Sequence, residues 1–253
     1  MKIGNPLSFA SDLPVAFLLL TRWPMPRLQD AAFTQSARAV WTYPLVGAAL
    51  GVMAYGIATA ATAAGVPSAL TAGLVLAALM LSTGAMHEDG LADTVDGFWG
   101  GQSAETRLAI MKDSQIGSYG TLALLITVGL RWSALSVILV LAPMAAIACF
   151  ALSRAAMPVV MCGLPPARED GLARSVGRPS FAPTAWGAGL AVLIALALLG
   201  AAAIGPVLAV IFMTACVAAL ASRKIAGQTG DVLGSTQQLS ETAALVICTV
   251  VLT

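Results

Sequence analysis

The chain has 253 residues, of which 58% are apolar and only 10% are charged, and its mean hydropathy is +0.88. Soluble domains carry about 25% charged and about 45–50% apolar residues, so this composition excludes an ordinary water-soluble domain and indicates a membrane protein. The net charge of +1, with scattered basic residues, argues against a nucleic-acid-binding surface, so we expect no nucleic-acid partner.

Long stretches without charge predict the membrane crossings. Residues 44–86 and 179–222 contain no Asp, Glu, Lys or Arg, and residues 116–163 contain only Arg131 and Arg154. About 20 helical residues cross a bilayer, so each stretch is long enough for two crossings. The sequence therefore predicts an all-α, polytopic membrane protein with six spans in three hairpins, all in one transmembrane domain over residues 1–253. The expected hairpin turns are Gly65-Val66-Pro67, Pro143 and Gly205-Pro206.

The two flanks are apolar but short. Residues 7–20 are interrupted by Asp12 and Pro14, and residues 243–252 form an apolar tail too short to cross alone. We expect both to form short interfacial or partly embedded helices. A cleaved signal peptide is not expected, because Arg22 and a Trp-Pro-Met-Pro run stand where a small-residue cleavage site would lie.

The charged residues gather on one predicted face. Six spans in hairpins put the N-terminal arm and residues 87–115, 164–182 and 223–241 on the same side, and these segments hold every charged residue except the two span arginines. Lys and Arg are biased toward the cytoplasm, so this face is predicted to be cytoplasmic. Any chemistry is therefore expected at the cytoplasmic membrane surface.

An acidic cluster follows the second predicted span, where residues 87–97 read HEDGLADTVDG. If the helix of the span continues, Asp89, Asp93 and Asp96 lie on one face, where they repel one another and the C-terminal helix dipole. This arrangement predicts a cation site, and oxygen-only ligands suit Mg²⁺ or Mn²⁺ better than zinc. A solvated acidic cap is the alternative, and His87 is interpreted as structural. The candidate metal ligands are Glu88, Asp89, Asp93 and Asp96.

Two further features suggest phosphate binding. Lys112 and Ser114 precede Gly117 and Gly120 at the start of the third span, where backbone N–H groups and an ammonium group suit a phosphate, although Lys112 could also simply anchor the span. Arg154 lies roughly 14 Å inside its span by the helical rise. We expect Arg154 to meet a phosphate or carboxylate in a cavity open to the cytosol, with snorkelling as the alternative, and Arg131 to snorkel.

A short sequence repeat and a glycine-rich loop add candidates. Residues 88–92, EDGLA, recur at 169–173, by chance or through duplication. The second copy continues with Arg174 and Arg178, whose guanidinium groups would suit a diphosphate. Residues 223–234 combine two basic residues, three glycines and Asp231. This composition is equally typical of a phosphate-binding loop and of a flexible turn.

Four segments together resemble one family, the membrane-embedded cobalamin synthases, also called adenosylcobinamide-GDP ribazoletransferases. The similar segments occur in the family's order over nearly the whole chain. Small departures are Ala226 and Gln228 beside Gly227, and Gln115 where a basic residue is common. The segments are LTRWPMP at 20–26, HEDGLADTVDGFWGG at 87–101, IMKDSQIGSYG at 110–120, and TGDVLG at 229–234 continuing to Glu241.

The resemblance implies the last assembly step of cobalamin in a bacterial inner membrane. α-Ribazole, or its 5′-phosphate, joins adenosylcobinamide-GDP with release of GMP, and Mg²⁺ is required. We hypothesise that Asp89 and Asp93 bind the metal with help from Glu88 or Asp96, that Asp93 and Asp96 are catalytic, and that Asp96 is the first candidate for general base. We also expect Asp231 to complete the metal or ribose site. A homo-oligomer is possible. The candidate substrate-binding residues are Arg22, Lys112, Ser114, Arg154, Arg174, Arg178, Thr229 and Asp231.

Two rival functions remain open. CDP-alcohol phosphotransferases also place aspartates around Asp-Gly, but Ala-Arg follows in their motif, whereas Asp93 follows Ala92 here and only residues 170–174 match in part. An ion-coupled transporter would carry carboxylates near mid-bilayer. Every Asp and Glu of this chain instead falls in the predicted cytoplasmic segments.

Overall fold

The computed structural model describes residues 11–26, 28, 33 and 36–253, and this part of the chain is helical without a β-strand. The short elements are α1 (Asp12–Leu20), η2 (Ala39–Thr42), α6 (Ala104–Ile110), α9 (Leu172–Val176) and η3 (Gly200–Ala203). The longer helices are α3 (Tyr43–Ala63), α4 (Ser68–Thr83), α5 (Met86–Gly100), α7 (Ser118–Leu141), α8 (Ala145–Gly163), α10 (Phe181–Leu199), α11 (Ile204–Ile225) and α12 (Gly230–Leu252).

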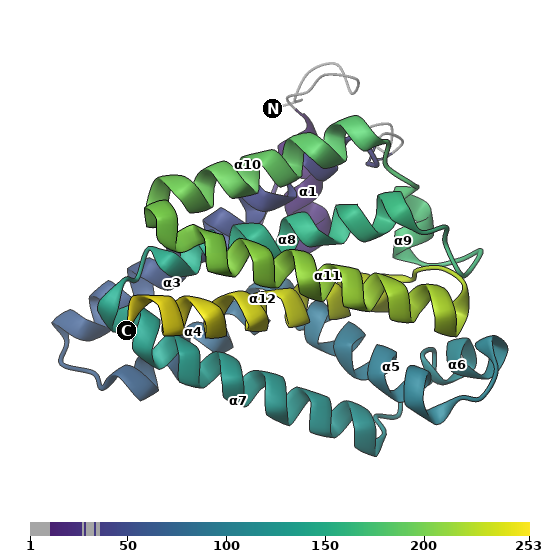
Figure 1. Ribbon diagram of the computed structural model, residues 1–253, viewed down its shortest axis with the longest axis horizontal. Helices are drawn as coiled ribbons and strands as arrows, with labels where there is room; N and C mark the ends of the chain where they lie inside the picture. The colour runs from purple at the N-terminus through teal and green to yellow at the C-terminus, as the bar shows by residue number, and fades with distance from the viewer. Residues whose placement is uncertain (1–10, 27, 29–32, 34–35) are drawn as a thin grey trace.

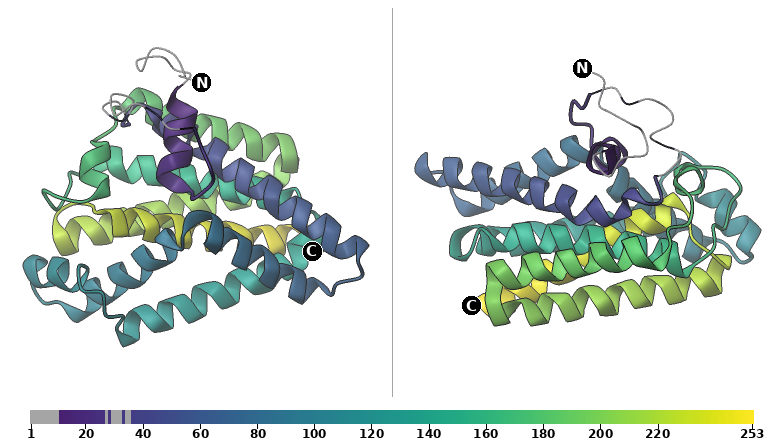
Figure 2. Two further views of the ribbon diagram at one scale, coloured as in Figure 1. Left: turned by 180° about the vertical axis from the view of Figure 1, so that it is seen from behind. Right: turned by 90° about the horizontal axis from the view of Figure 1, so that it is seen from above.

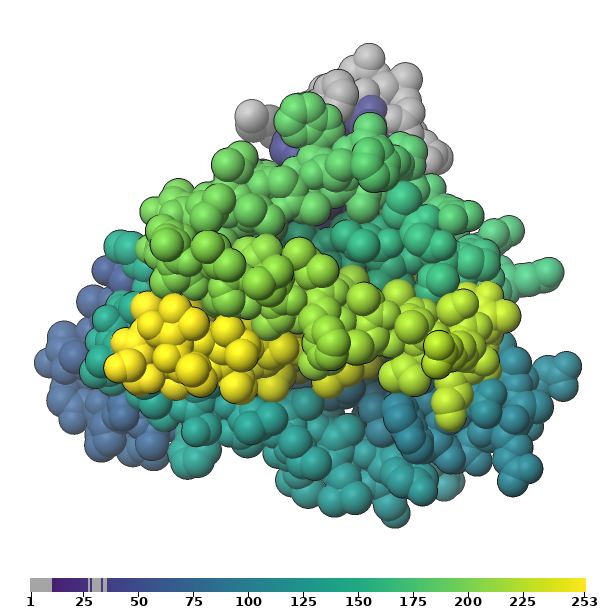
Figure 3. Space-filling model, in the orientation of Figure 1, coloured from purple at the N-terminus to yellow at the C-terminus, as the bar shows by residue number. Residues whose placement is uncertain are grey.

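Several of these helices form a multi-pass membrane bundle. Four helical stretches are long and apolar enough to cross a bilayer: Ala39–Ala63, Ser118–Leu141, Ala145–Gly163 and Phe181–Ile225. The last stretch turns back at η3, so α10 and α11 run in opposite directions (Figure 1). Large apolar side chains such as Leu208 and Phe212 of α11 are exposed, as expected for contact with lipid. Figure 3 shows that α11 lies at the surface of the molecule. The protein is therefore an all-α, multi-pass membrane protein.

The three predicted hairpins are present as α3–α4, α7–α8 and α10–α11. The count of six spans stays a prediction, because α4 has only 16 residues and is not among the four stretches long and apolar enough to cross. The first two turns fall at Gly65-Val66-Pro67 and Pro143 as predicted. The third lies at η3, a few residues before the predicted Gly205-Pro206, and these two residues occupy the first turn of α11. A proline is tolerated there because the N–H groups of a first helical turn have no partner within the helix.

The second span does not continue into the acidic segment as predicted. Gly84 and Ala85 both adopt positive φ angles, 67° and 55°, which end α4, and α5 starts at Met86 with a bend of 87°. Glu88 and Asp89 therefore lie in the first turn of a new helix. The macrodipole favours acidic side chains at that end, which reverses the unfavourable dipole expected from the sequence.

The C-terminal segment is not a short interfacial helix. α12 is 23 residues long and packs against α5, α7, α8 and α11, so it runs through the middle of the bundle (Figure 2). Its polar middle, which includes Gln237, Gln238 and Glu241, is buried. The prediction failed because this polar stretch lowers the hydropathy of the segment. In the folded protein, other polar groups in the bundle supply hydrogen-bond partners for these side chains.

The N-terminal helix α1 covers the beginning of the first span. Residues 7–10 of the predicted apolar flank lie outside the described residues, and α1 packs against η2 and α3. The buried carboxylate of Asp12 pairs with Arg38 at 2.7 Å and accepts a hydrogen bond from Trp41 Nε1 at 2.9 Å. This ion pair explains how an otherwise apolar helix accommodates an acidic residue.

Candidate active site

Three carboxylates from two helices meet at one end of the bundle. Asp89 and Asp93 lie one turn apart on α5, and Asp231 lies in the first turn of α12, which crosses α5. The crossing is close because glycines form it. A Cβ on Gly90 would lie 2.9 Å from the carbonyl oxygen of Asp231, and one on Gly234 would lie 3.2 Å from the Cα of His87. Glycine at both positions therefore brings the carboxylates together.

The cluster carries excess negative charge. Partial burial raises the pKa of Asp93 to about 7, with further contributions from repulsion by Asp89, Asp231 and Asp96, while Arg168 acts in the opposite sense. Burial also raises the pKa of Asp231, again against the influence of Arg168. These shifts show that the carboxylates lack full neutralisation by the protein.

Arg168 is the site residue that the sequence analysis missed. Its Nη1 lies 3.2 Å from Asp231 Oδ2, and its Nη2 donates to the carbonyl oxygen of Leu108 at 3.0 Å. Thr229 holds the same carboxylate: its hydroxyl donates to Asp231 Oδ2 at 3.2 Å and accepts from the N–H of Val232 at 3.3 Å. The only sequence signal for Arg168 was its place directly before the second EDGLA segment.

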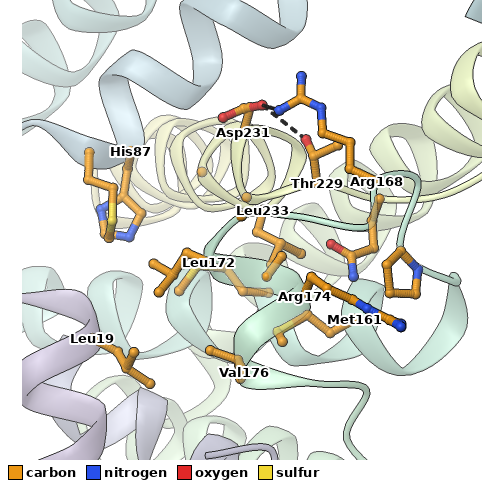
Figure 4. A pocket seen from close by; sticks show the side chains of 18 of the residues that line it. Leu19, His87, Met161, Arg168, Leu172, Arg174, Val176, Thr229, Asp231 and Leu233 are labelled. Carbon is orange, nitrogen blue, oxygen red and sulfur yellow. Dashed lines mark hydrogen bonds and ion pairs between the residues drawn. The ribbon is translucent and has the colours of Figure 1, made fainter. Parts of the chain in front are cut away.

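A cavity of about 200 Å³ opens beside the carboxylates (Figure 4). Asp89, Arg174, Thr229 and Asp231, four of the predicted site residues, line it, together with Arg168. Side chains from α1, α3, α8, α9 and α12 complete the wall. The predicted residues that come together are therefore those around this cavity. The apolar part of the wall contains Leu19, Leu20, Tyr43, Met157, Met161, Leu172, Val176 and Leu233.

Asp96 points to a different partner. Its two carboxylate oxygens accept hydrogen bonds from the N–H groups of Gly117 at 2.7 Å and Gly120 at 2.9 Å, at the beginning of α7. The helix N-terminus predicted to bind a phosphate is thus occupied by a carboxylate of this chain. Asp96 therefore fixes α7 against α5, and we no longer assign it as metal ligand or general base.

The remaining surface candidates have local partners. Lys112 pairs with Asp170 at 2.6 Å, and both side chains are more than half exposed; the Lys112 hydrogen bond lowers the pKa of Asp170. Arg178 donates to the carbonyl oxygens of Cys162 and Gly163, where it caps α8. Ser114 is exposed, and Arg22 lies against the break between α4 and α5, where its side chain would contact a Cβ on Gly84.

A buried polar network surrounds both span arginines. Arg131 lies 3.1 Å from Glu88 and 2.7 Å from Glu241, and Arg154 lies 3.1 Å from the other oxygen of Glu241. Gln238 bridges Arg131 and Glu88. Arg131 does not snorkel, because a compensating pair of glutamates is available inside the bundle.

This network also changes the interpretation of Arg154 and Glu88. Arg154 has the expected carboxylate partner, but it is only 2% exposed, so it does not reach a substrate phosphate as predicted. Glu88 is engaged by Arg131 and is no longer a candidate metal ligand. Glu88 and Glu241 are buried between the helices, although the sequence analysis placed both in segments on the charged cytoplasmic face.

The carboxylates could hold a cation only if further ligands completed its coordination. Among the described residues, no three His, Cys, Asp or Glu side chains are close enough to form a complete cation site. Mg²⁺ is usually held by one or two carboxylates together with water and substrate phosphates. Asp89 and Asp93 are oxygen donors with uncompensated charge, so the donor set fits Mg²⁺ in that mode.

The two EDGLA segments differ in structure but meet at the same cavity. The first is helical within α5, whereas in the second Gly171 has a φ of 92° and precedes α9. Both nevertheless contribute to the wall of the cavity, through Asp89 and through residues 170–173. The match therefore marks two sides of one site rather than two copies of one local fold.

The fold and the site define a multi-pass membrane protein with an acid-rich cavity at one end of its bundle. The sequence model of the family described as cobalamin-5-phosphate synthase matches residues 12–249. The chain belongs to this family of cobalamin-synthesising transferases, which confirms the resemblance seen in its motifs.

Similar curated proteins cover nearly the whole chain. An adenosylcobinamide-GDP ribazoletransferase of Sinorhizobium sp is 43% identical over 94% of this chain and 95% of its own length. Proteins with the same description from Bradyrhizobium diazoefficiens and Mesorhizobium japonicum are 39% and 36% identical, over 94% and 100% of this chain and 92% and 99% of their own lengths. No solved structure matches the chain.

Proposed function

We propose that this protein is an adenosylcobinamide-GDP ribazoletransferase that works at the cytoplasmic face of a bacterial inner membrane. It transfers adenosylcobinamide phosphate from adenosylcobinamide-GDP to α-ribazole or its 5′-phosphate. The full-length similarity to proteins with that description supports the activity. The structural observation that carries the proposal is a cavity lined by Asp89 and Asp231, with Asp93 near enough to both for their charges to raise its pKa.

The reaction requires one phosphorus–oxygen bond to form and one to break. The oxygen of a ribose hydroxyl bonds to the phosphorus attached to cobinamide, and the bond from that phosphorus to the bridging oxygen of the diphosphate breaks. GMP leaves with the bridging oxygen, and the hydroxyl proton passes to a base. Such a transfer needs little covalent help from the protein, so positioning and charge neutralisation supply most of the catalysis.

We assign the roles from position. Asp89 and Asp93 would hold Mg²⁺, which when bound neutralises the diphosphate and makes its phosphorus more electrophilic. Arg168 and Arg174, on the wall of the cavity, would face phosphate oxygens. Asp231 replaces Asp96 as the candidate proton acceptor, because it lines the cavity and Thr229 and Arg168 fix its orientation.

Replacement of Asp93 by Asn tests this assignment. The variant should insert into membranes normally but lose Mg²⁺-dependent release of GMP from adenosylcobinamide-GDP and α-ribazole, because an amide is a much weaker ligand for Mg²⁺ than a carboxylate. Asp113→Asn is the matched control, since Asp113 is exposed and only bonds the N–H of Gln115. Near-normal turnover by Asp93→Asn would refute the assignment.

The substrate class needs a separate test. The purified protein should release GMP from the GDP-linked donor and should not release CMP from a CDP-linked alcohol. Release of CMP would instead support a lipid headgroup phosphotransferase. Mg²⁺ should be required in this assay, and full activity in EDTA would contradict the proposed metal.

A further inference from the structure

The cavity beside the carboxylates has a polar rim and an apolar interior. Asp89, Asp170 and Arg174 at the rim are exposed to solvent. The interior is formed by buried side chains from helices far apart in the sequence (Figure 4). The apolar interior side chains are Leu20, Tyr43, Met157, Met161, Val176 and Leu233, and two buried polar side chains, His87 and Gln228, line the cavity with them.

The size of the cavity limits its occupant. Sites for drug-sized ligands measure about 300–1,000 Å³, and this cavity is smaller, at about 200 Å³. A corrin macrocycle with its side chains therefore does not fit inside. A flat two-ring heterocycle does, with its sugar left at the rim.

Two bases enter the proposed reaction, and the wall chemistry distinguishes them. Guanine carries donors and acceptors around its whole edge, more than the two buried polar side chains His87 and Gln228 can pair, and the rest would be left without partners at a substantial cost. The base of ribazole is a benzimidazole whose carbocyclic ring carries two methyl groups and no polar atom. That ring matches the leucine, valine and methionine wall, and methionine sulfur packs well against aromatic rings.

An unpartnered nitrogen in the wall gives a second, independent observation. His87 lines the cavity and is only 2% exposed. Its Nε2 is buried and has no hydrogen-bond partner among the described residues. The benzimidazole of a ribazole keeps one unsubstituted ring nitrogen, an acceptor that a neutral imidazole N–H can satisfy.

We propose that this cavity binds the dimethylated benzimidazole base of the acceptor nucleoside. The inference rests on the proposed function and extends it by assigning a subsite. With the base inside, the ribose lies at the rim beside Asp89 and Asp231. The attacking hydroxyl is then held next to the carboxylates that receive the diphosphate, which is the positioning that the transfer requires.

The first experiment varies the acceptor. An acceptor with unmethylated benzimidazole should have a kcat/KM about fifteenfold lower than ribazole, because each of the two buried methyl groups contributes roughly a fourfold gain. Dissociation constants measured on the purified protein without the GDP-linked donor should differ by a similar factor. Equal values for the two acceptors would overturn the subsite.

The second experiment narrows the cavity. Leu172 lines it yet is 48% exposed, so Leu172→Trp should fold. We expect the KM for ribazole to rise at least tenfold while the KM for the GDP-linked donor stays unchanged. Val159→Trp is the matched control, because Val159 is 42% exposed and lines a separate apolar groove among α8, α10 and α11. It should leave both KM values unchanged.

A second variant of Leu172 removes side-chain atoms instead of adding them, so it is less prone to disturb folding. Leu172→Ala should reduce the preference for the methylated base from about fifteenfold to about fourfold, because part of the contact with the methyl groups is lost. A purely structural role for Leu172 would not change this ratio. An unchanged ratio, or a rise in the donor KM in place of the acceptor KM, would overturn the proposal.

The binding measurement separates this inference from the proposed function. If the protein releases no GMP from any substrate but still binds ribazole more tightly than the unmethylated nucleoside, the proposed function fails and the subsite stands. If GMP release is normal but Leu172→Trp affects neither binding nor the acceptor KM, the subsite fails alone.

Discussion

At the residue scale, the fold raises the pKa of Asp93 and so disfavours the ionised form of this carboxyl group when no metal is bound. Its neighbours are Asp89, Asp231 and Asp96, and Arg168 compensates only in part. Because the pKa of about 7 lies above the ordinary 3.8, the folded state binds more protons than the unfolded state between about pH 4 and 7. Stability contributed by the protonated form is therefore lost as the pH rises through that window.

Asp93→Asn should accordingly stabilise the metal-free protein at pH 8. The expected gain, after allowance for solvent screening of a partly exposed carboxylate, is about 1–2 kcal/mol. It should disappear near pH 5, where the native carboxyl is already protonated. Thermal unfolding in detergent with EDTA, at both pH values, measures this. A melting temperature at pH 8 below that of the unmodified protein would contradict the predicted repulsion.

Glycine is required at residues where another group comes closer than a Cβ permits. A Cβ on Gly120 would lie 2.9 Å from the carbonyl oxygen of Ala92 and would collide with the Asp96 carboxylate. Gly129 on the same helix has nothing within 4 Å of such an atom. The two positions form a natural pair for comparison.

Gly120→Ala should destabilise the protein by about 1–3 kcal/mol, because it forces Asp96 away from the beginning of α7. Gly129→Ala should be neutral or stabilising by about 0.5–1 kcal/mol, since alanine favours a helix interior. Melting temperatures in detergent compare the two. Equal effects from both variants would show that the hydrogen bonds of Asp96 do not fix α7.

At the scale of elements, the buried network joins α5, α7, α8 and α12. Arg131 of α7 contacts Glu88 of α5 and Glu241 of α12. Arg154 of α8 also contacts Glu241. Two cations and two anions leave the group neutral overall. Because Glu88 directly precedes Asp89, the network also fixes the start of the helix that carries the site.

Arg131→Met should cost about 3–5 kcal/mol, because it leaves two buried carboxylates with only Arg154 to neutralise them. Arg223→Met, at an exposed position of α11, should change stability by less than about 0.5 kcal/mol. Unfolding in detergent monitored by circular dichroism would show the difference. A small effect at Arg131 would mean that the network contributes little to the fold.

At the scale of the whole molecule, the charged end should face the cytoplasm. Residues of the loop before α9 should then be shielded from outside, and the turn between α3 and α4 should be accessible. We expect Ser68→Cys, in a background without the four native cysteines, to react with an impermeant thiol reagent on intact cells. Glu169→Cys should react only after permeabilisation. The reverse pattern would invert the topology.

Much of the membrane architecture was predictable because charge is excluded from hydrocarbon. The charge-free stretches gave the three hairpins, and the turn at Gly65-Val66-Pro67 fell where predicted. The acidic motif and the family resemblance likewise depended on local sequence. The break at Gly84 and Ala85 was not predictable, because a positive φ at an alanine has no clear signal in sequence.

By itself, the sequence determined the class of protein, the hairpins, the acidic motif and the family, because these depend on composition and on residues adjacent in the chain. Only the tertiary structure decided which acids share a site: Asp231 joins Asp89 and Asp93, while Asp96 and Glu88 turn to other partners. Arg168 and the central position of α12 were likewise settled there. A buried polar group takes whichever partner the crossing helices bring near it, and crossings between distant segments are not encoded in local patterns.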